Sequence, residues 1–258
     1  MLEIMKFKMK DTYPPPKKLT VRPLRFLVYI DGFNLYKGIN HEDPPDLLRL
    51  GWCDYQKLGE SLVELAFHHA GGERTVAVKL FTAGVSKDTA TSGEIERQKL
   101  WRDVLKLECP RLDIIDGIHV SRSKDFSDRK EKMTDVNIAI HASIDVLQLR
   151  PAGIVIVSGD RDFMPIAEFA ATNDVPIAVF FPQEHSLYAL PPGVNYSNRV
   201  EITYLTREMM SRCRMSDRRW IEYLQLKVRD RSKFQPCLDH ELRRQVGQAH
   251  STKPGSRR

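Results

Sequence analysis

The sequence predicts an α/β protein built on a central, mostly parallel sheet. Short apolar runs of strand length alternate with longer stretches of helical spacing, which is the pattern of repeated β-α-β units. Two of these runs, Leu24 to Ile30 and Ile154 to Val157, are apolar almost throughout. Such runs are typical of strands that are covered on both faces. We therefore expect helices on both sides of the sheet.

The composition indicates a soluble globular protein. A chain of 258 residues, 41% of them apolar, is long enough for a large buried core. Its four cysteines are widely scattered, which argues against both a disulfide framework and a zinc site. No apolar stretch approaches the length of a membrane-spanning helix, and the Pro-rich N-terminus lacks the apolar core of a signal peptide. We expect a cytoplasmic protein.

Three parts are predicted along the chain. Residues 1–23 form a flexible, Pro-rich leader, residues 24–205 the α/β domain, and residues 206–258 a basic, partly helical extension with a disordered tail. From Arg207 onward, fourteen Lys and Arg stand against six Asp and Glu, a surplus of +8 that leaves −2 for the preceding residues. A basic segment indicates a polyanion partner such as RNA. The alternative is a solvated, disordered tail.

The first half of the domain alternates helix and strand. After the first strand, Asp54 is a preferred N-cap residue for a helix that runs to about His69. Apolar residues recur in this helix at helical spacing and give it one buried face. A strand at Thr75–Thr82 follows, then a charged amphipathic helix opened by Ser92, and then a strand at Leu112–Val120.

The second half begins with a polar stretch, Ser121 to Met133, which is predicted to be a loop. Thr134 then caps a helix from Asp135 to about Leu149. Apolar residues occur on nearly every side of this helix, so we expect it to be largely buried. After the strand at Ile154, the last two strands are expected at Val175–Phe181 and Val200–Tyr204.

Two carboxylates follow the strand that starts at Ile154. Ser158 and Gly159 end that strand, and Asp160 and Asp162 come next. A spacing of two places both side chains on one side of an extended segment, and ligands of open α/β sheets collect beyond the carboxyl ends of the strands. This layout is typical of a metal or phosphate site. The structural alternative is that Asp160 starts a turn and Asp162 caps the next helix.

The first strand also ends in a carboxylate, Asp31. In a right-handed crossover the helix runs antiparallel to the strands, so its N-terminus lies at the carboxyl edge of the sheet. Asp135 is therefore expected at the same edge as Asp31 and Asp160. The alternative for Asp135 is a favourable interaction with the helix macrodipole, worth about 0.3–1 kcal/mol.

Four carboxylates from three separate segments are thus predicted at one edge: Asp31, Asp135, Asp160 and Asp162. Crowded carboxylates repel one another and tend to take up protons unless a cation neutralises them. Hard divalent cations prefer oxygen ligands, so Mg²⁺ or Mn²⁺ is the implied cofactor. Such an ion would activate water and stabilise the charge that develops on a phosphodiester under attack.

Three stretches together resemble the NYN domain, a family of PIN-like nucleases that includes LabA-type proteins. These are VYIDGFNLYKG from Val28, KMTDVNIAIHASIDVL from Lys132 and IVIVSGDRDFMPIAEFA from Ile154. The resemblance covers about Leu24 to Val200. It implies a PIN-like three-layer α/β/α fold, an acidic site for divalent metal, and ribonuclease activity.

The resemblance also implies roles for individual residues. By position, the four carboxylates correspond to the family's metal-binding set. Asn34 matches the Asn of the motif, with an implied role in orienting a metal-bound water or a phosphate. Ser158 occupies the family's Ser or Asn position beside the first acid of its segment. These six residues make up the predicted catalytic set.

One position departs from the family pattern. Many members carry another Asp six residues after the acid that opens the helix, and this chain has His141 there. Asp145 lies ten residues after Asp135, about 15 Å along a helix axis, which is too far to share an ion. We expect Asp145 to be a structural acid and His141 a buried, hydrogen-bonded histidine.

Several cations are candidates for contact with nucleic acid. Lys132 belongs to the motif and either contacts phosphate or pairs with the carboxylates. Arg212, Arg218 and Arg219 in the extension are further candidates for RNA contact.

The sequence therefore predicts a metal-dependent ribonuclease that binds RNA and no membrane. Two alternatives stay open: a non-catalytic RNA-binding or regulatory protein of the same fold, and a metal-dependent enzyme that acts on a small molecule. Formation of a homo-oligomer is also left open.

Overall fold

The computed structural model describes residues 22–39, 53–121, 130–182 and 200–215. Its strands are β1 (Leu24–Asp31), β2 (Arg74–Gly84), β3 (Leu112–Val120), β4 (Lys130–Lys132), β5 (Gly153–Val157), β6 (Ile177–Phe181) and β7 (Val200–Tyr204). Its helices are α1 (Gly32–Ile39), α3 (Tyr55–Ala66), α4 (Ser92–Glu108), α5 (Thr134–Leu149), α6 (Met164–Thr172) and α7 (Arg207–Arg212), with a short 3-10 helix, η1 (Arg161–Phe163).

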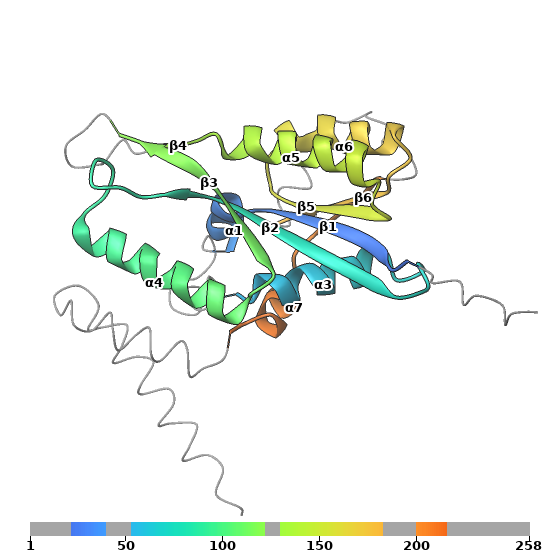
Figure 1. Ribbon diagram of the computed structural model, residues 1–258, viewed down its shortest axis with the longest axis horizontal. Helices are drawn as coiled ribbons and strands as arrows, with labels where there is room; N and C mark the ends of the chain where they lie inside the picture. The colour runs from blue at the N-terminus through green and yellow to red at the C-terminus, as the bar shows by residue number, and fades with distance from the viewer. Residues whose placement is uncertain (1–21, 40–52, 122–129, 183–199, 216–258) are drawn as a thin grey trace, which may run out of the picture.

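The strands of the described chain form one twisted sheet in the order β4-β3-β2-β1-β5-β6-β7. Every neighbouring pair is parallel except β3 and β4, which are antiparallel. Figure 1 shows α5 and α6 on one face of the sheet and α3, α4 and α7 on the other. The prediction of a three-layer α/β/α fold with a mostly parallel sheet is confirmed.

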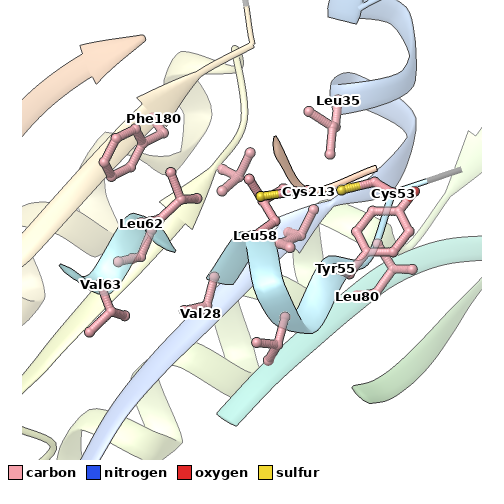
Figure 2. Close-up of a cluster of buried hydrophobic side chains, with 14 of the residues drawn as sticks. Val28, Leu35, Cys53, Tyr55, Leu58, Leu62, Val63, Leu80, Phe180 and Cys213 are labelled. Carbon is pink, nitrogen blue, oxygen red and sulfur yellow. The ribbon is translucent and has the colours of Figure 1, made fainter. Parts of the chain in front are cut away.

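The two faces of the sheet have separate cores, because successive side chains of a strand point to opposite faces. In β1, Phe26 and Val28 are buried under α3, whereas Leu27 and Tyr29 are buried under α5 and α6. Figure 2 shows the first core, in which Leu58 and Leu62 of α3 lie over the sheet. The central strands are therefore covered on both sides, as their apolar sequence predicts.

The helix start expected at Asp54 is confirmed, since its side chain accepts a hydrogen bond from the Lys57 N–H. Helix α4 begins at Ser92, as expected, and a capping box between Thr91 and Glu94 precedes and stabilises its first turn. Both caps satisfy N–H groups that the first turn of a helix leaves without partners.

The segment before α5 differs from its predicted structure. Part of the expected loop forms strand β4, which pairs with the end of β3. The predicted cap at Thr134 is wrong: the cap position is Met133, which has a left-handed backbone with φ 74° and makes no side-chain cap bond. Helix α1, which directly follows Asp31, was also not anticipated.

The prediction that α5 is largely buried is wrong for its outer side. Ile138, Ala142 and Val146 are fully or almost fully buried against the sheet. On the opposite side, Ile140 and Leu147 remain 51% and 57% exposed. The sheet covers only one side of the helix, whereas its sequence is apolar on both.

Several predictions concern residues outside the described ranges. These are the leader up to residue 21 and the extension beyond residue 215, including Arg218 and Arg219. Within the described ranges, no helix is both long and apolar enough to cross a membrane.

Candidate acidic site at the carboxyl edge of the sheet

The ends of β1 and β5 are joined by a buried hydrogen bond. The two strands are parallel neighbours with Ile30 opposite Val157, so Asp31 and Ser158 come next at the same edge. The Ser158 hydroxyl donates to Oδ2 of Asp31 at 3.0 Å. Asp31 is 4% exposed and Ser158 is fully buried, so water does not compete for this bond.

Asn34 ties the first turn of α1 to the same point. Its backbone N–H donates to Oδ1 of Asp31 at 2.9 Å, and its side-chain oxygen accepts from the Gly159 N–H at 2.8 Å. The Asp31 carboxylate thus receives one hydrogen bond on each oxygen. Since the amide oxygen of Asn34 holds the turn after β5, the observed role of Asn34 is to fix the backbone around Asp31.

Asp160 lies in the turn that follows β5. Its N–H donates to the Ser158 hydroxyl at 3.1 Å, and its Oδ1 accepts from the Asp162 N–H at 2.9 Å. Asp160 is therefore the N-cap of η1, a structural role that the sequence suggested for Asp162. Asp162 lies within η1 and is exposed, so the expected extended geometry of the acid pair is wrong.

The third segment of the site contains two acids rather than one. Strand β4 brings Glu131 to the start of α5, and the Thr134 hydroxyl donates a hydrogen bond to Glu131. Asp135 occupies the first turn of α5. In β3, Gly117 makes room for this turn, since a Cβ there would lie 2.6 Å from Oγ1 of Thr134.

Glu131 could not be predicted from the sequence because β4 has only three residues, Lys-Glu-Lys. Such a short run shows neither strand nor helix periodicity. The one available signal was that Glu131 stands three residues before Thr134, whose hydroxyl it accepts from.

The pKa values of Asp31, Glu131 and Asp135 are each raised in part by the negative charge of a neighbouring acid. The pKa of Asp31 is raised to about 6: burial is the largest cause, the hydrogen bonds from Asn34 and Ser158 oppose it, and the charges of Asp135 and Glu131 add to it. Deep in the protein the ionised form loses its hydration, which is why burial dominates.

Neighbouring charges also change the pKa values of Asp135 and Glu131. Burial raises the pKa of Asp135, the charges of Asp160 and Asp162 add to this, and Lys132 opposes it. Glu131 also has a pKa raised by burial and by Asp135, against the Thr134 hydrogen bond and the charge of Lys37. All four carboxylates predicted for the site therefore meet at this edge, together with Glu131.

The chemistry of this donor set fits a divalent cation, because every candidate ligand is a carboxylate or carbonyl-type oxygen and the charges are in excess. The carboxylates are not already close enough together to coordinate an ion. Among the residues that the structure describes, no three His, Cys, Asp or Glu side chains are grouped closely enough to hold a metal ion. A cation would therefore have to draw these side chains together.

The predicted nucleic-acid contacts fall in two places. Lys132 is exposed beside Asp135 and lowers its pKa, which fits the predicted pairing with the carboxylates. Arg212 pairs with Glu208 and lines an open groove beside α3, none of whose lining residues belongs to the acidic site.

The acid further along α5 has a structural role, as expected. Asp145 is buried, accepts a hydrogen bond from the Tyr29 hydroxyl at 2.8 Å and forms an ion pair with Lys79 at 2.5 Å. Burial, followed by the charge of Asp145, raises the pKa of Tyr29, so its hydroxyl stays protonated. His141 is half-buried, with Nδ1 3.5 Å from the Lys79 amine.

Comparison with known proteins finds, among others, one curated relative and one solved structure. The 6-hydroxy-3-succinoylpyridine 3-monooxygenase HspA of Pseudomonas putida (strain DSM 28022 / S16) is 29% identical over 198 residues, which are 64% of this chain and 62% of that protein. The chain thus spans less than two thirds of this relative's length. MurG of Acinetobacter baumannii aligns with a TM-score of 0.29 and 9% identity over 70% of this chain and 46% of its own. A score this low carries no argument.

The family model of the NYN domain matches residues 25–191, which is more than half of the chain. The matched range contains β1, α5 and β5, the elements that bring the carboxylates together. The chain therefore belongs to the NYN domain family of the PIN-like nuclease superfamily.

Proposed function

We propose that this protein is a divalent-metal-dependent ribonuclease that hydrolyses phosphodiester bonds of RNA. One observation carries the proposal: in an NYN domain, the acids of β1, α5 and the turn after β5 lie at the carboxyl edge of a parallel sheet, where burial and the charges of neighbouring acids raise the pKa of Asp31 and of Asp135. This is the edge at which open α/β sheets bind ligands. An excess of carboxylates there is stabilised by a cation and destabilised without one.

Asp31, Asp135 and Asp160 are the residues that would hold Mg²⁺ or Mn²⁺, with Asp162 and Glu131 at the margin of the site. When bound, such an ion lowers the pKa of a coordinated water and neutralises charge on a phosphoryl oxygen. Asp31 is already oriented for this role by the Asn34 N–H and the Ser158 hydroxyl. Ser158 is thus a positioning residue rather than a group that touches substrate.

Residues beside the site match the chemistry of single-stranded RNA. Phe33 and Tyr36 of α1 are 41% and 52% exposed, close in sequence to Asp31. The amine of Lys37 lies 4.2 Å from the centre of the Phe33 ring. Exposed aromatic rings stack on bases, and neighbouring lysines attract phosphates. With Lys132, whose charge acts on Asp135, and Lys37, whose charge acts on Glu131, these residues would supply stacking surfaces and positive charge near the acids.

Cleavage of end-labelled single-stranded RNA tests this function. Purified full-length protein should cut RNA with Mn²⁺ or Mg²⁺ and stop with EDTA. Asp160→Asn should lose about a hundredfold or more of the activity, since it removes a charge that the ion requires. The matched control is Asp103→Asn, an exposed acid on α4, which should cut like the wild type.

Two results would count against the nuclease. Equal cutting by wild type and Asp160→Asn would place the activity in a contaminant. RNA binding without cutting in either ion would support the alternative of a non-catalytic RNA-binding protein of this fold.

A second candidate function is oxidation of a small molecule. It is favoured by the relative named as a 6-hydroxy-3-succinoylpyridine 3-monooxygenase, which is similar over 64% of this chain. Monooxygenation consumes O₂ and needs a reductant. Oxygen uptake with 6-hydroxy-3-succinoylpyridine and a reduced nicotinamide or flavin, absent when the pyridine is left out, would support this candidate over the ribonuclease.

A further inference from the structure

Helix α5 carries a line of large apolar side chains on the side that faces away from the sheet. The line consists of Met133, just before the helix, and Val136, Ile140, Ile144 and Leu147, each between 45% and 59% exposed. Figure 1 shows α5 at the outside of its layer, with the sheet beneath it. A contiguous exposed apolar patch of this kind marks an interaction surface more often than a random scatter of apolar residues does.

The spacing along the line is that of a helix-pairing seam. Successive members are three, four, four and three residues apart, an average of 3.5. Apolar residues that repeat every 3.5 residues keep one seam facing a second helix. Beside the line, Asn137, Ser143 and Gln148 carry no charge, and the charged Lys132 and Arg150 lie just beyond its two ends. A lipid surface or a nucleic acid would instead select Lys and Arg at the flanks.

The line is also symmetric about its middle residue. Relative to Ile140, the other members lie at minus seven, minus four, plus four and plus seven. A two-fold axis through Ile140 therefore places Met133 opposite Leu147 and Val136 opposite Ile144. Two-fold dimers need a surface that complements itself in this way.

We propose that α5 pairs antiparallel with α5 of a second copy of this chain, about a two-fold axis through Ile140. The uncharged face complements its own copy, in a chain of which 29% of the residues are charged. The same axis sets Arg150 of the partner subunit opposite Lys130, ten residues to either side of Ile140, so the apolar seam and not a charge pair stabilises the contact.

One segment of this chain that could cover the seam is the chain beyond Met215. The described chain reaches Met215 on the opposite face of the sheet, where Arg214 bridges to Cys53 just before α3. A second copy meets no such obstacle. Since specific interfaces bury about 800 Å² per partner and one helix seam supplies less, we expect a dissociation constant in the micromolar range.

Sedimentation equilibrium of the full-length protein over a range of concentrations tests the proposal with a pair of charge variants. Ile140→Glu and Ile140→Lys each set like charges against each other at the axis, so each should weaken dimerisation about tenfold or more. An equimolar mixture should recover the dimer, because Glu then faces Lys. Leu107→Glu is the control, since Leu107 is 61% exposed on α4 and away from the seam.

Three outcomes would overturn the proposal. One is a wild type that stays monomeric at roughly 100 µM, well above the expected dissociation constant. Another is dimerisation by Ile140→Glu and by Ile140→Lys that is as tight as that of the wild type. The third is a mixture no more dimeric than its components. A monomer that loses thermal stability in Ile140→Glu but not in Leu107→Glu would show that the chain covers the seam with its own residues.

Discussion

At the scale of single residues, Asp31 is held in place by the protein at a cost in stability. Its carboxylate is buried, and its pKa is raised from 3.8 to about 6. The folded protein therefore binds a proton at Asp31 more tightly than the unfolded chain does. Stability from this group is present below pH 4 and is lost as the pH rises through 6. At neutral pH the ionised Asp31 destabilises the fold, as expected for a residue selected for function.

We predict that Asp31→Asn raises the thermal stability at pH 8. The change in pKa corresponds to a cost of about 3 kcal/mol for the charged form, and we expect about 1–3 kcal/mol of this to be recovered. The gain should shrink toward zero near pH 4, where the wild-type carboxylate is protonated. Thermal denaturation followed by circular dichroism between pH 4 and 8 gives the profile.

Asp103→Asn, at an exposed position on α4, is the control for this profile and should change the stability little at any pH. A destabilised Asp31→Asn at pH 8 would contradict the account, because it would mean that the charge on Asp31 is favourably paired in the metal-free protein.

The residues of the site differ in how well the sequence predicts them. Asp31 and Asp160 follow buried strands, so their position at the edge follows from the strands alone. The position of Glu131 depends on the β3–β4 pairing, which cannot be predicted from a strand of only three residues. Ser158 and Asn34 were assigned through the family motif, and their hydrogen bonds to Asp31 and Gly159 need the folded chain to be seen.

At the scale of elements, the turn between β4 and α5 places two of the acids. Met133 has a left-handed backbone there, and the Thr134 hydroxyl holds Glu131. Strain of this sort costs of order 1–3 kcal/mol and persists where the surrounding structure enforces it. The close approach at Gly117 is part of that enforcement, since Lys132 O would lie 2.7 Å from a Cβ there.

We predict that Gly117→Ala lowers the free energy of unfolding by about 1–3 kcal/mol, because the added methyl group overlaps the turn. The same variant should lower RNA cleavage, since the turn carries Asp135. Denaturant unfolding and the cleavage assay measure the two effects. Gly71→Ala is the matched control, as no heavy atom lies within 4 Å of its added methyl group.

An equal free energy of unfolding for Gly117→Ala and Gly71→Ala would show that the turn between β4 and α5 can shift to accommodate the methyl group without loss of stability. Loss of stability with unchanged cleavage would show instead that the position of Asp135 does not depend on this contact.

Elements with strong periodicity were predicted well. The expected bounds Leu112–Val120 and Val200–Tyr204 match β3 and β7. The exposure of α5 was not predictable, because a sequence that is apolar on nearly every side of a helix does not show which of those sides the rest of the chain covers. The cap was missed because a Thr before an apolar run is a common N-cap, whereas here Met133 adopts the unusual backbone.

At the scale of the whole molecule, the convergence of the acids was predictable and their spacing was not. Parallel strands and a right-handed crossover place the ends of β1, β5 and the start of α5 at one edge. How closely the side chains approach depends on turns such as Asp160–Asp162, where Asp160 caps η1. The described part of the chain therefore brings these carboxylates to one edge without grouping three of them closely enough to hold an ion.

The central claim is that Asp31, Asp135 and Asp160 together bind a divalent cation, and Mn²⁺ binding to the full-length protein tests it most directly. Titration followed by electron paramagnetic resonance should show binding by the wild type. Replacing any one of the three by Asn should weaken it by about tenfold or more, equivalent to 1.4 kcal/mol. Asp103→Asn should bind Mn²⁺ like the wild type. Absence of binding in the wild type, or variants that all bind Mn²⁺ as tightly as the wild type, would contradict the claim.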